Sequence, residues 1–374
     1  MTQRIRVGPP TLKKLQPLLK LDNHHWLIAL AIDYALIGFA VFLTLGVSWW
    51  LYPISLVIIG STQRAFANLL HESSHGILAE NRAINVIAGT VLSGWWIAHL
   101  LVAYRQSHVA FHHRYYAKPE GDPDIRFHRD LGLYDPNESH RRFLVKNVVA
   151  VLLGFRAPAY LLYLWRDRIC FRDREVTLPM PLSAAAERRL FFVFWATVAV
   201  ALTLAGLWAE FLLFWAVPFF TTFAVIGWLA ELSEHFPLPD SETDKLLMTR
   251  NRYGWAIERF LFGRHGDAYH LVHHVMPTIP TWNLARANRI LREDPVYRRW
   301  DDAWGGLFTR DRPGQETLLS YIAKYREARA GGLPPGARFA RALVYGDPPD
   351  ATEAAADAVA AESAEATAAG PRAA

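Results

Sequence analysis

Two pairs of long apolar segments constrain the fold of this chain more than any other feature. The first pair covers residues 26–45, with Asp33 as its only charge, and residues 47–62 beyond a break at Gly46. The second pair covers residues 190–208 and 211–230. Segments of about 20 apolar residues are long enough to cross a bilayer as helices. We therefore expect an all-α membrane protein with four transmembrane helices in two hairpins, interfacial helices and a cytosolic histidine-rich cap.

Two other apolar segments are ambiguous. Residues 83–104 contain His99 and are expected to dip into the membrane and return, or to lie at its surface. Residues 143–165 contain Lys146, Arg156 and Pro158, which favours an amphipathic helix in the membrane plane. Four spans are expected, with six as the competing count.

The distribution of positive charge predicts the orientation of the spans. The short connections within the two hairpins lack Lys and Arg, whereas the flanks before Trp26, around Arg188 and after Lys245 are rich in them. Positive residues stay on the cytoplasmic side of membrane helices. We therefore expect a multi-pass integral membrane protein with both termini and the histidine clusters described next on the cytoplasmic side.

Composition narrows the class of protein. With 52% hydrophobic and 20% charged residues, the chain is too apolar for two soluble domains. Its net charge of +5 is scattered rather than gathered in a stripe, which argues against nucleic acid and favours membrane phosphates. Arg250, Arg252, Arg259 and Arg264 are expected on a basic cytoplasmic surface, in contact with phospholipid or with an acidic electron carrier. The single cysteine, Cys170, leaves histidines and carboxylates to hold any metal.

Eight of the fifteen histidines form three boxes. The boxes are His71-Glu-Ser-Ser-His75, His108-Val-Ala-Phe-His112-His113 and His270-Leu-Val-His273-His274. Spacings of three and four return to one helix face, so each box should present at least two imidazoles to one point. His113 and His274 directly follow a candidate ligand and should point to a different side, toward a second metal. His235, at the end of the second hairpin, is a ninth candidate. This number exceeds what one ion can bind, and a dinuclear iron site that uses O₂ is favoured over zinc, with copper as a chemical alternative.

Residues near the boxes have expected supporting roles. Carboxylates should accept the second ring N–H of the imidazoles, and the candidates are Glu72, Glu231, Glu234, Asp122, Asp124 and Asp267. The sequence 121–124 fits a plain turn equally well. The remaining histidines are expected at the surface or around the ligands: His24, His25, His99, His128, His140 and His265, of which His265 is the strongest further candidate. Four tryptophans are expected as membrane anchors rather than channel residues: Trp95, Trp96, Trp228 and Trp255.

With these boxes the chain resembles the integral-membrane fatty acid desaturase and hydroxylase superfamily, over about residues 16–297 as judged from motif order. The resemblance implies a four-helix stem with a cytosolic cap, two non-haem irons bound by nine histidines, and O₂ as co-substrate. The implied ligands are His71, His75, His108, His112, His113, His235, His270, His273 and His274. Some members have an Asn four residues before the lone ligand histidine, where it reaches a metal-bound water. Glu231 occupies that position here, so this role is in doubt.

The resemblance also implies a domain organisation. We expect a cytosolic arm (1–25), a membrane desaturase-like diiron domain (26–310), a cytosolic segment (311–346) and a disordered Ala-rich tail (347–374), whose deletion should leave activity nearly intact. The chain has no His-Pro-Gly-Gly stretch and too few cysteines for rubredoxin iron. A separate ferredoxin, rubredoxin or cytochrome b5 type donor with its reductase is therefore expected.

The expected activity is O₂-dependent oxidation of an aliphatic C–H bond in a fatty acyl or lipid-like substrate held in an apolar channel. Desaturation is favoured, on class frequency. The alternatives are hydroxylation of an alkane, carotenoid or other lipid, and oxidative decarboxylation of a fatty acid to a terminal alkene. A membrane metal transporter is a remote alternative, because its ligands should cross the bilayer, whereas these histidines gather at one end.

Overall fold

The computed structural model describes residues 7–115, 121–171, 178–239, 245–332 and 336–346. Within these ranges the regular structure is helical, and the one β-type contact is an isolated bridge between Trp304 and Glu316. The all-α class expected from the sequence is therefore confirmed for this part of the chain. The tail 347–374 lies outside the described residues, so its expected disorder stays a prediction.

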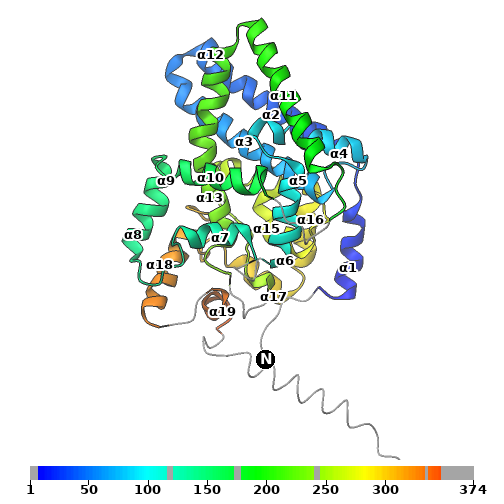
Figure 1. Cartoon of the computed structure of the whole chain (residues 1–374). Coiled ribbons are helices and arrows are strands. Elements are labelled where there is room, and N and C mark those ends of the chain that lie inside the picture. Colours follow the sequence, from blue (N-terminus) through cyan, green and yellow to red (C-terminus); the bar gives the residue numbers. More distant parts are fainter. Residues whose placement is uncertain (1–6, 116–120, 172–177, 240–244, 333–335, 347–374) are drawn as a thin grey trace, which may run out of the picture.

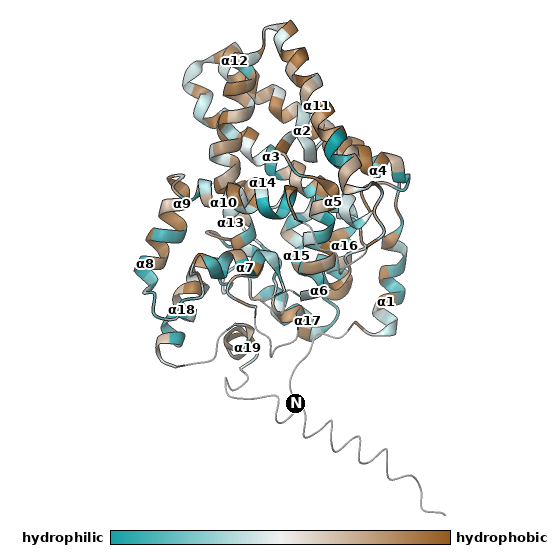
Figure 2. Ribbon diagram, in the orientation of Figure 1, coloured by the Kyte–Doolittle hydropathy of each residue, from teal (hydrophilic) through white to brown (hydrophobic). Residues whose placement is uncertain are grey.

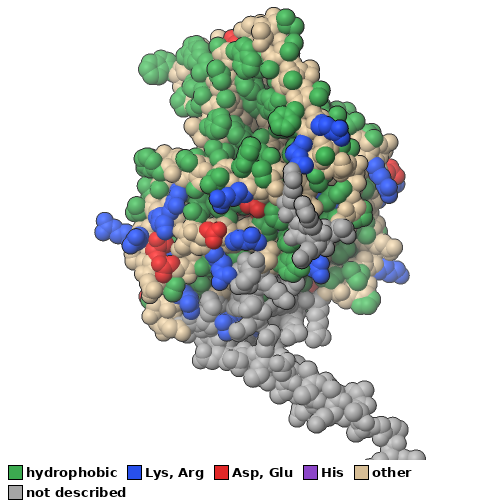
Figure 3. All heavy atoms as spheres, viewed as in Figure 1, with side chains coloured by type: hydrophobic (Ala, Val, Ile, Leu, Met, Phe, Trp, Pro, Cys, Tyr) green, Lys and Arg blue, Asp and Glu red, His purple; other side chains and the backbone are tan. Residues whose placement is uncertain are grey.

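Five helices, most of them long, form an upright bundle at the top of the molecule (Figure 1). They are α2 (His25–Phe42), α3 (Tyr52–His75), α11 (Ala184–Ala205), α12 (Trp208–Phe211) and α13 (Ala224–His235). Hydrophobic residues predominate in this bundle (Figure 2). On the face shown in Figure 3, Lys and Arg side chains appear only below the upper portion of the bundle. The apolar top has the surface of a membrane-embedded unit, above a more polar lower layer.

Among the described residues, three continuous helical segments have the length and hydropathy of a membrane span: His25–Val47, Ala184–Ala205 and Trp208–His235. These match three of the four expected spans. The fourth expected span lies in α3, whose first half is apolar and whose second half buries Gln63, Arg64 and Asn68. α3 therefore runs beside α2 but becomes polar where it leaves the apolar bundle for the interior of the lower layer.

Each ambiguous segment is bent. The helical segments Arg82–Ile97 and Leu101–Tyr115 meet at 94°, which agrees with a chain that turns back. Residues 143–165 do not form one in-plane helix, because segments His140–Leu152 and Ala157–Ile169 meet at 77°. Gly154, with φ +80°, and Pro158, near the start of the second segment, explain this break. Counting both bent pairs as spans gives at most five among the described residues, one fewer than the competing count.

Shorter helices form the lower layer (Figure 1). They are α1 (Pro9–Leu15), α4 (Arg82–Gly89), α5 (Leu101–Tyr104), α6 (His113–Tyr115), α7 (Pro123–Asp130), α8 (His140–Leu144), α9 (Ala150–Leu152), α10 (Ala157–Leu164), α14 (Ala256–Phe262), α15 (His270–Val275), α16 (Thr281–Leu291), α17 (Pro295–Asp302), α18 (Leu318–Ala330) and α19 (Ala337–Tyr345). Leu271 of α15 shares one buried core with Trp300, Trp304 and Tyr321. The C-terminal helices thus pack into the core that supports the third histidine box.

Burial corrects two expectations about surface residues. Trp95 and Trp228 are 4% and 1% exposed, so they are core residues and not membrane anchors, whereas Trp255 is 62% exposed. Arg250 and Arg252 are buried as well, and of the four arginines expected on a basic surface, Arg259 alone is exposed. Arg250 and Arg252 are buried because the guanidinium of each has partners in the protein interior.

Those interior partners are explicit for Arg250. Its guanidinium lies 4.9 Å from the Trp304 ring centroid and donates to the Phe236 carbonyl. Burial lowers the pKa of Arg250 to about 10. A guanidinium held in this way stabilises the interior of the lower layer and does not present its charge to a partner protein.

Gly60 marks a close approach between α3 and the segment before α13. A Cβ at Gly60 would lie 2.7 Å from Thr222 Cβ and 2.8 Å from the Phe223 backbone nitrogen. We expect Gly60→Val to force the two elements apart and to cost roughly 1–3 kcal/mol of stability. Thermal unfolding of the detergent-solubilised protein measures the effect. Gly38→Val is the matched control because nothing lies within 4 Å of its added Cβ; equal midpoints for the two variants would contradict the prediction.

Candidate metal centre

The first box lies on a polar stripe of α3. Arg64, Asn68, His71 and His75 recur at intervals of four, three and four residues, so they share one helix face. This face leads from the apolar bundle into the lower layer, where α3 ends at His75 and Gly76 adopts φ +79°. The two imidazoles of the box therefore meet at one place, as their spacing predicts.

The second box divides in a way that α-helical spacing does not predict. Residues Arg105–His112 form a π-helix, and the His113 N–H donates to the His108 carbonyl. Its wider turn brings residues five apart together, so His108 and His113 belong to one group of histidines and His112 belongs to the other. The prediction from α-helical spacing, which paired His108 with His112 and directed His113 toward a different metal, is therefore wrong.

The histidines of the third box also belong to two different groups, although they lie on a regular α-helix. His270 and His274, four residues apart on α15, lie together with His235 from the end of α13. His273 points to the other place, beside His71. His274 therefore belongs to the same group as His270, contrary to expectation, and His273 belongs to the group that contains His71.

The nine histidines form two groups whose ligand nitrogens all lie within 4.8 Å of one another in each group. One group is His71, His75, His108, His113 and His273, and the other is His112, His235, His270 and His274. Neighbouring Nε2 atoms are 3.1 Å apart for His71 and His273 and 2.9 Å apart for His273 and His113. In the second group they are 3.0 Å apart for His235 and His270.

These separations fit metal ligation. Two nitrogens bound at about 2.1 Å and at right angles to one metal would be about 3 Å apart. Burial and then neighbouring imidazoles hold the pKa of His270 and His273 well below its usual range. They are therefore neutral at physiological pH, which is the form that binds a metal. In the part of the chain that the structure describes, the buried Nε2 atom of His75 has no hydrogen-bond partner. Both groups therefore suit metal ions better than a hydrogen-bonded histidine network.

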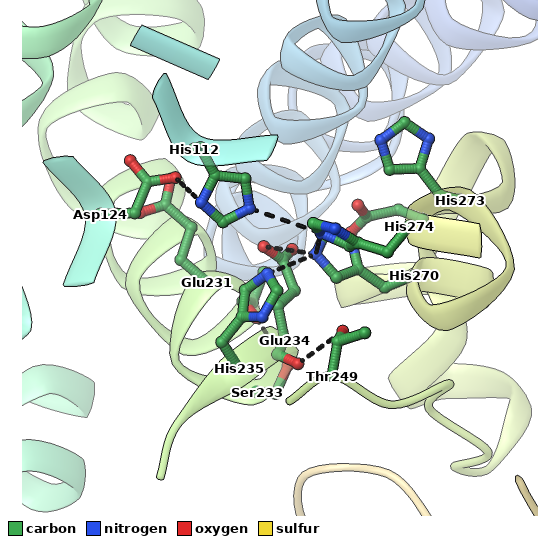
Figure 4. Close-up of polar contacts among 12 residues, drawn as sticks. His112, Asp124, Glu231, Ser233, Glu234, His235, Thr249, His270, His273 and His274 are labelled. Carbon is green, nitrogen blue, oxygen red and sulfur yellow. Dashed lines mark hydrogen bonds and ion pairs between the residues drawn. The ribbon is translucent and has the colours of Figure 1, made fainter. Parts of the chain in front are cut away.

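Two carboxylates at the start of α7 contact the His112 ring on the side that faces away from His274 (Figure 4). Asp122 Oδ2 lies 2.9 Å from His112 Nδ1, and Asp124 Oδ2 lies 3.5 Å from the same atom. The other Asp122 oxygen accepts the backbone N–H groups of Asp124 and Ile125 and so caps α7. Asp122 therefore combines the turn and the supporting role that the sequence left open.

The other expected carboxylates divide by what they contact. Glu72 Oε1 is 3.3 Å from His71 Nδ1, and Glu234 Oε2 is 3.8 Å from His270 Nε2. Asp267 pairs with Arg64 and Arg252 instead of a histidine. Glu231 accepts a hydrogen bond of 2.8 Å from the Tyr160 hydroxyl. Four of the six candidates thus lie against imidazoles, and the last two do not.

Asp122 provides a test of how far the ligand depends on its carboxylate partner. Asp122→Ala removes the 2.9 Å contact to His112 and the cap of α7. Because such partners fix the orientation and basicity of a ligand, we expect metal affinity to fall about 10–100-fold. Competition with a chelator measures the affinity. Asp130→Ala, on the exposed end of α7, should leave it unchanged; the same affinity in both variants would refute the assignment.

The six remaining histidines join neither group. His265 Nε2 instead lies 2.8 Å from Asp33 Oδ2, and Arg264 pairs with the same carboxylate. His99 and His128 are buried rather than at the surface. The His99 Nδ1–H group donates to the Ile97 carbonyl at 2.8 Å. The further ligand role considered for His265 is therefore replaced by a tie between α2 and the loop before α15.

A small cavity adjoins both groups. His71 and His108 of one group and His270 of the other line it. Its volume is about 30 Å³. Sequence reasoning missed most of its other lining residues, among them Arg64, Tyr104, Tyr160 and Arg168. The stripe on α3 could have revealed Arg64, because it lies seven residues before His71, whereas nothing in the sequence joins Tyr160 and Arg168 to the boxes.

Comparisons with known proteins agree with this geometry. The chain matches the family model described as fatty acid desaturase over residues 47–302, a range that contains all nine converging histidines. It is also 38% identical over 311 residues to dihydrorhizobitoxine desaturase of Bradyrhizobium elkanii. That alignment covers 83% of this chain and 86% of the relative. These matches confirm the resemblance inferred from the boxes.

Proposed function

This chain belongs to the fatty acid desaturase family, and from that premise we propose that it is a diiron enzyme that uses O₂ to desaturate an aliphatic substrate. The observation that carries the proposal is the convergence of nine histidines into two groups of five and four. A site made of imidazoles suits iron, and the number of ligands calls for two ions. The proposed ligands are therefore His71, His75, His108, His113 and His273 for one iron, and His112, His235, His270 and His274 for the other.

The overall reaction converts a –CH2–CH2– unit, O₂, two electrons and two protons into –CH=CH– and two molecules of water. Bound iron supplies the one-electron and O₂ chemistry for this conversion. The chain fixes the imidazoles through Asp122, Glu72 and the Met248 carbonyl, which lies 3.0 Å from His235 Nδ1. Its other task is to place one carbon beside both groups, which is where the cavity lies.

Desaturation is favoured over the other outcomes. The named reaction of the Bradyrhizobium elkanii relative is a desaturation, of dihydrorhizobitoxine. The family implies a lipid substrate and a membrane setting. Hydroxylation of an alkane, carotenoid or other lipid and oxidative decarboxylation of a fatty acid use the same ligands, and so they are the outcomes against which the proposal is tested.

The electrons come, in this proposal, from a separate ferredoxin, rubredoxin or cytochrome b5 type donor with its reductase. The cytoplasmic placement of the site, predicted from the distribution of Lys and Arg, would give such a donor access. A metal transporter is disfavoured because both histidine groups lie where α3 and α13 end, at one end of the apolar bundle. Asp33, the charged residue within α2, pairs with Arg264 and His265.

Product analysis tests the reaction. Cells that express the full chain are grown in air, and their lipids and small metabolites are compared by mass spectrometry with those of cells that express His273→Ala. We expect a product lighter than its precursor by two hydrogens, present for the parent and absent for the variant. His140→Ala is the control, because His140 belongs to neither group. Products that carry only an added hydroxyl group, or a terminal alkene one carbon shorter, would reject desaturation.

A further inference from the structure

A second cavity lies among apolar side chains, away from the histidines. Its volume is about 390 Å³, and residues of α3, α9, α13, α14 and the segment just before α13 line it. Among the described residues that form its wall, none is charged and none is a histidine. The wall consists of leucine, valine, isoleucine and phenylalanine, with two threonines and one glycine. We call this space the apolar cavity.

α13 separates the apolar cavity from the small cavity beside the histidines. Val225, Ile226 and Leu229 line the apolar cavity. Glu231 and Glu234 line the small one. On a helix with 3.6 residues per turn, these two sets lie on nearly opposite faces of α13. A molecule in the apolar cavity is therefore held away from the proposed irons, and this cavity has a role other than binding the reacting carbon.

The apolar cavity opens toward the bilayer. Leu152 and Leu153 line it and are still 53% and 66% exposed, and Val57 is 39% exposed. Val57 lies in the apolar half of α3, and the lining residues of α13 lie within the candidate span Trp208–His235. In Figure 2, α9 and α14 lie at the level where the upper bundle meets the lower layer. The surroundings of the opening are therefore lipid.

The two threonines in the wall do not offer a hydroxyl proton to water. Thr221 donates to the Val217 carbonyl and Thr222 donates to the Leu56 carbonyl, both at 2.6 Å. Ordered water in a cavity needs several polar partners, which this wall does not provide. Because the space is apolar, large and open to lipid, a flexible hydrocarbon chain is the ligand that fits it.

A cation without a partner lies beside this cavity. Arg259 is exposed on α14, one turn before the lining residue Phe262, so both are on the same side of that helix. Among the described residues, no carboxylate forms an ion pair with Arg259. Trp255 and Ile257, near the start of α14, are 62% and 61% exposed, which is typical of the headgroup level of a bilayer. A lipid phosphate is the anion available at that level.

We propose that the apolar cavity binds one acyl chain of a membrane phospholipid, and that Arg259 pairs with the phosphate of the same molecule. The acyl chain fills the space between the corner that joins α9 to α10 and the helices α3, α13 and α14, so the lipid is part of the packing of this fold. It is not the substrate, because the opposite face of α13 borders the cavity beside the histidines. This assignment depends on the membrane setting and on no property of the metal centre.

Photolabelling tests the proposal. The full chain in detergent is incubated with a phosphatidylglycerol that carries a diazirine in one acyl chain, illuminated, and digested for mass spectrometry. We expect the label about tenfold more often on Leu153, Leu229 and Leu261, which line the cavity, than on Phe192 and Val200 of α11. Phe192 and Val200 are 70% and 59% exposed, so they report lipid that merely surrounds the protein.

Two substitutions fill the cavity from different walls. Val225→Trp fills it from α13, and Leu153→Trp fills it from its exposed side. Either variant should lose the label on Leu229 and Leu261, and a single peak in size-exclusion chromatography shows that the variant is folded. Val200→Trp, at a residue that does not line the cavity, is the matched control and should keep the label.

Two further substitutions test the phosphate. Arg259→Gln should reduce the labelling roughly twofold, which is the scale of an exposed ion pair. Arg189→Gln, at an exposed arginine of α11, should leave it unchanged. A fatty alcohol with the same diazirine chain should label the cavity more weakly than the phospholipid does, because it has no phosphate.

Label spread evenly over α11 and the cavity would show surrounding lipid only and would overturn the proposal. Label on Leu229 that survives both tryptophan variants would overturn it as well. Equal labelling in Arg259→Gln and Arg189→Gln, or by the fatty alcohol and the phospholipid, would refute recognition of the phosphate and with it the proposed ligand.

Discussion

Replacing His273 and His274 together by alanine is expected to reduce bound iron from about two ions per chain to nearly none. The pair is chosen because the two neighbours belong to different groups. His273 Nε2 lies 2.9 Å from that of His113, whereas His274 Nε2 lies 3.2 Å from that of His270. One double substitution therefore removes a ligand from each proposed iron site, which no pair from the first box can do.

Elemental analysis of the detergent-purified protein measures the loss. His140→Ala should keep both ions, since His140 starts α8 and joins neither group. The single variants extend the test, because His273→Ala should weaken binding of one ion and His274→Ala binding of the other. Zinc in place of iron, or iron content that the double substitution does not change, would show that the two groups are not an iron site.

Asp33→Ala is expected to destabilise the protein by about 3–5 kcal/mol, because it leaves a buried guanidinium without its counter-charge. Asp33 is fully buried within α2 and pairs with Arg264 and His265. Arg264 also donates to Thr62 Oγ1 at 2.9 Å, and its carbonyl accepts from Asn68 at 3.0 Å. The cluster ties two helices of the bundle to the loop that leads into the third box.

The same variant should therefore affect the metal centre. His265 and Gly266 have φ values of +51° and +77°. A backbone in this region is strained, so the loop before α15 needs the contacts with Asp33 to keep its conformation. We expect a lower thermal midpoint together with reduced iron content. Ile32→Ala is the matched control, since Ile32 is 52% exposed on the adjacent face of α2. A midpoint for Asp33→Ala as high as that of Ile32→Ala would count against the tie.

Much of this protein is determined by local sequence. Long apolar segments predict membrane helices because the bilayer accepts a backbone only when its hydrogen bonds close within the segment. The spacing of four residues predicted the pairing of His71 with His75, because α-helical geometry repeats whatever the surroundings. The eight histidines of the boxes were identified by their spacing, and His235 by its position at the end of the second hairpin.

Tertiary structure alone decided how those histidines are shared between two places. The π-helix at Arg105–His112 separates His112 from His108, and packing, not residue spacing, selects such a turn. The burial of Trp228 and Arg250 could not be predicted from the sequence either, because residue type indicates only an average tendency to be buried. The cavity likewise draws Glu231, Tyr160 and Arg168 from distant helices, and only the folded chain brings their charges beside the histidines.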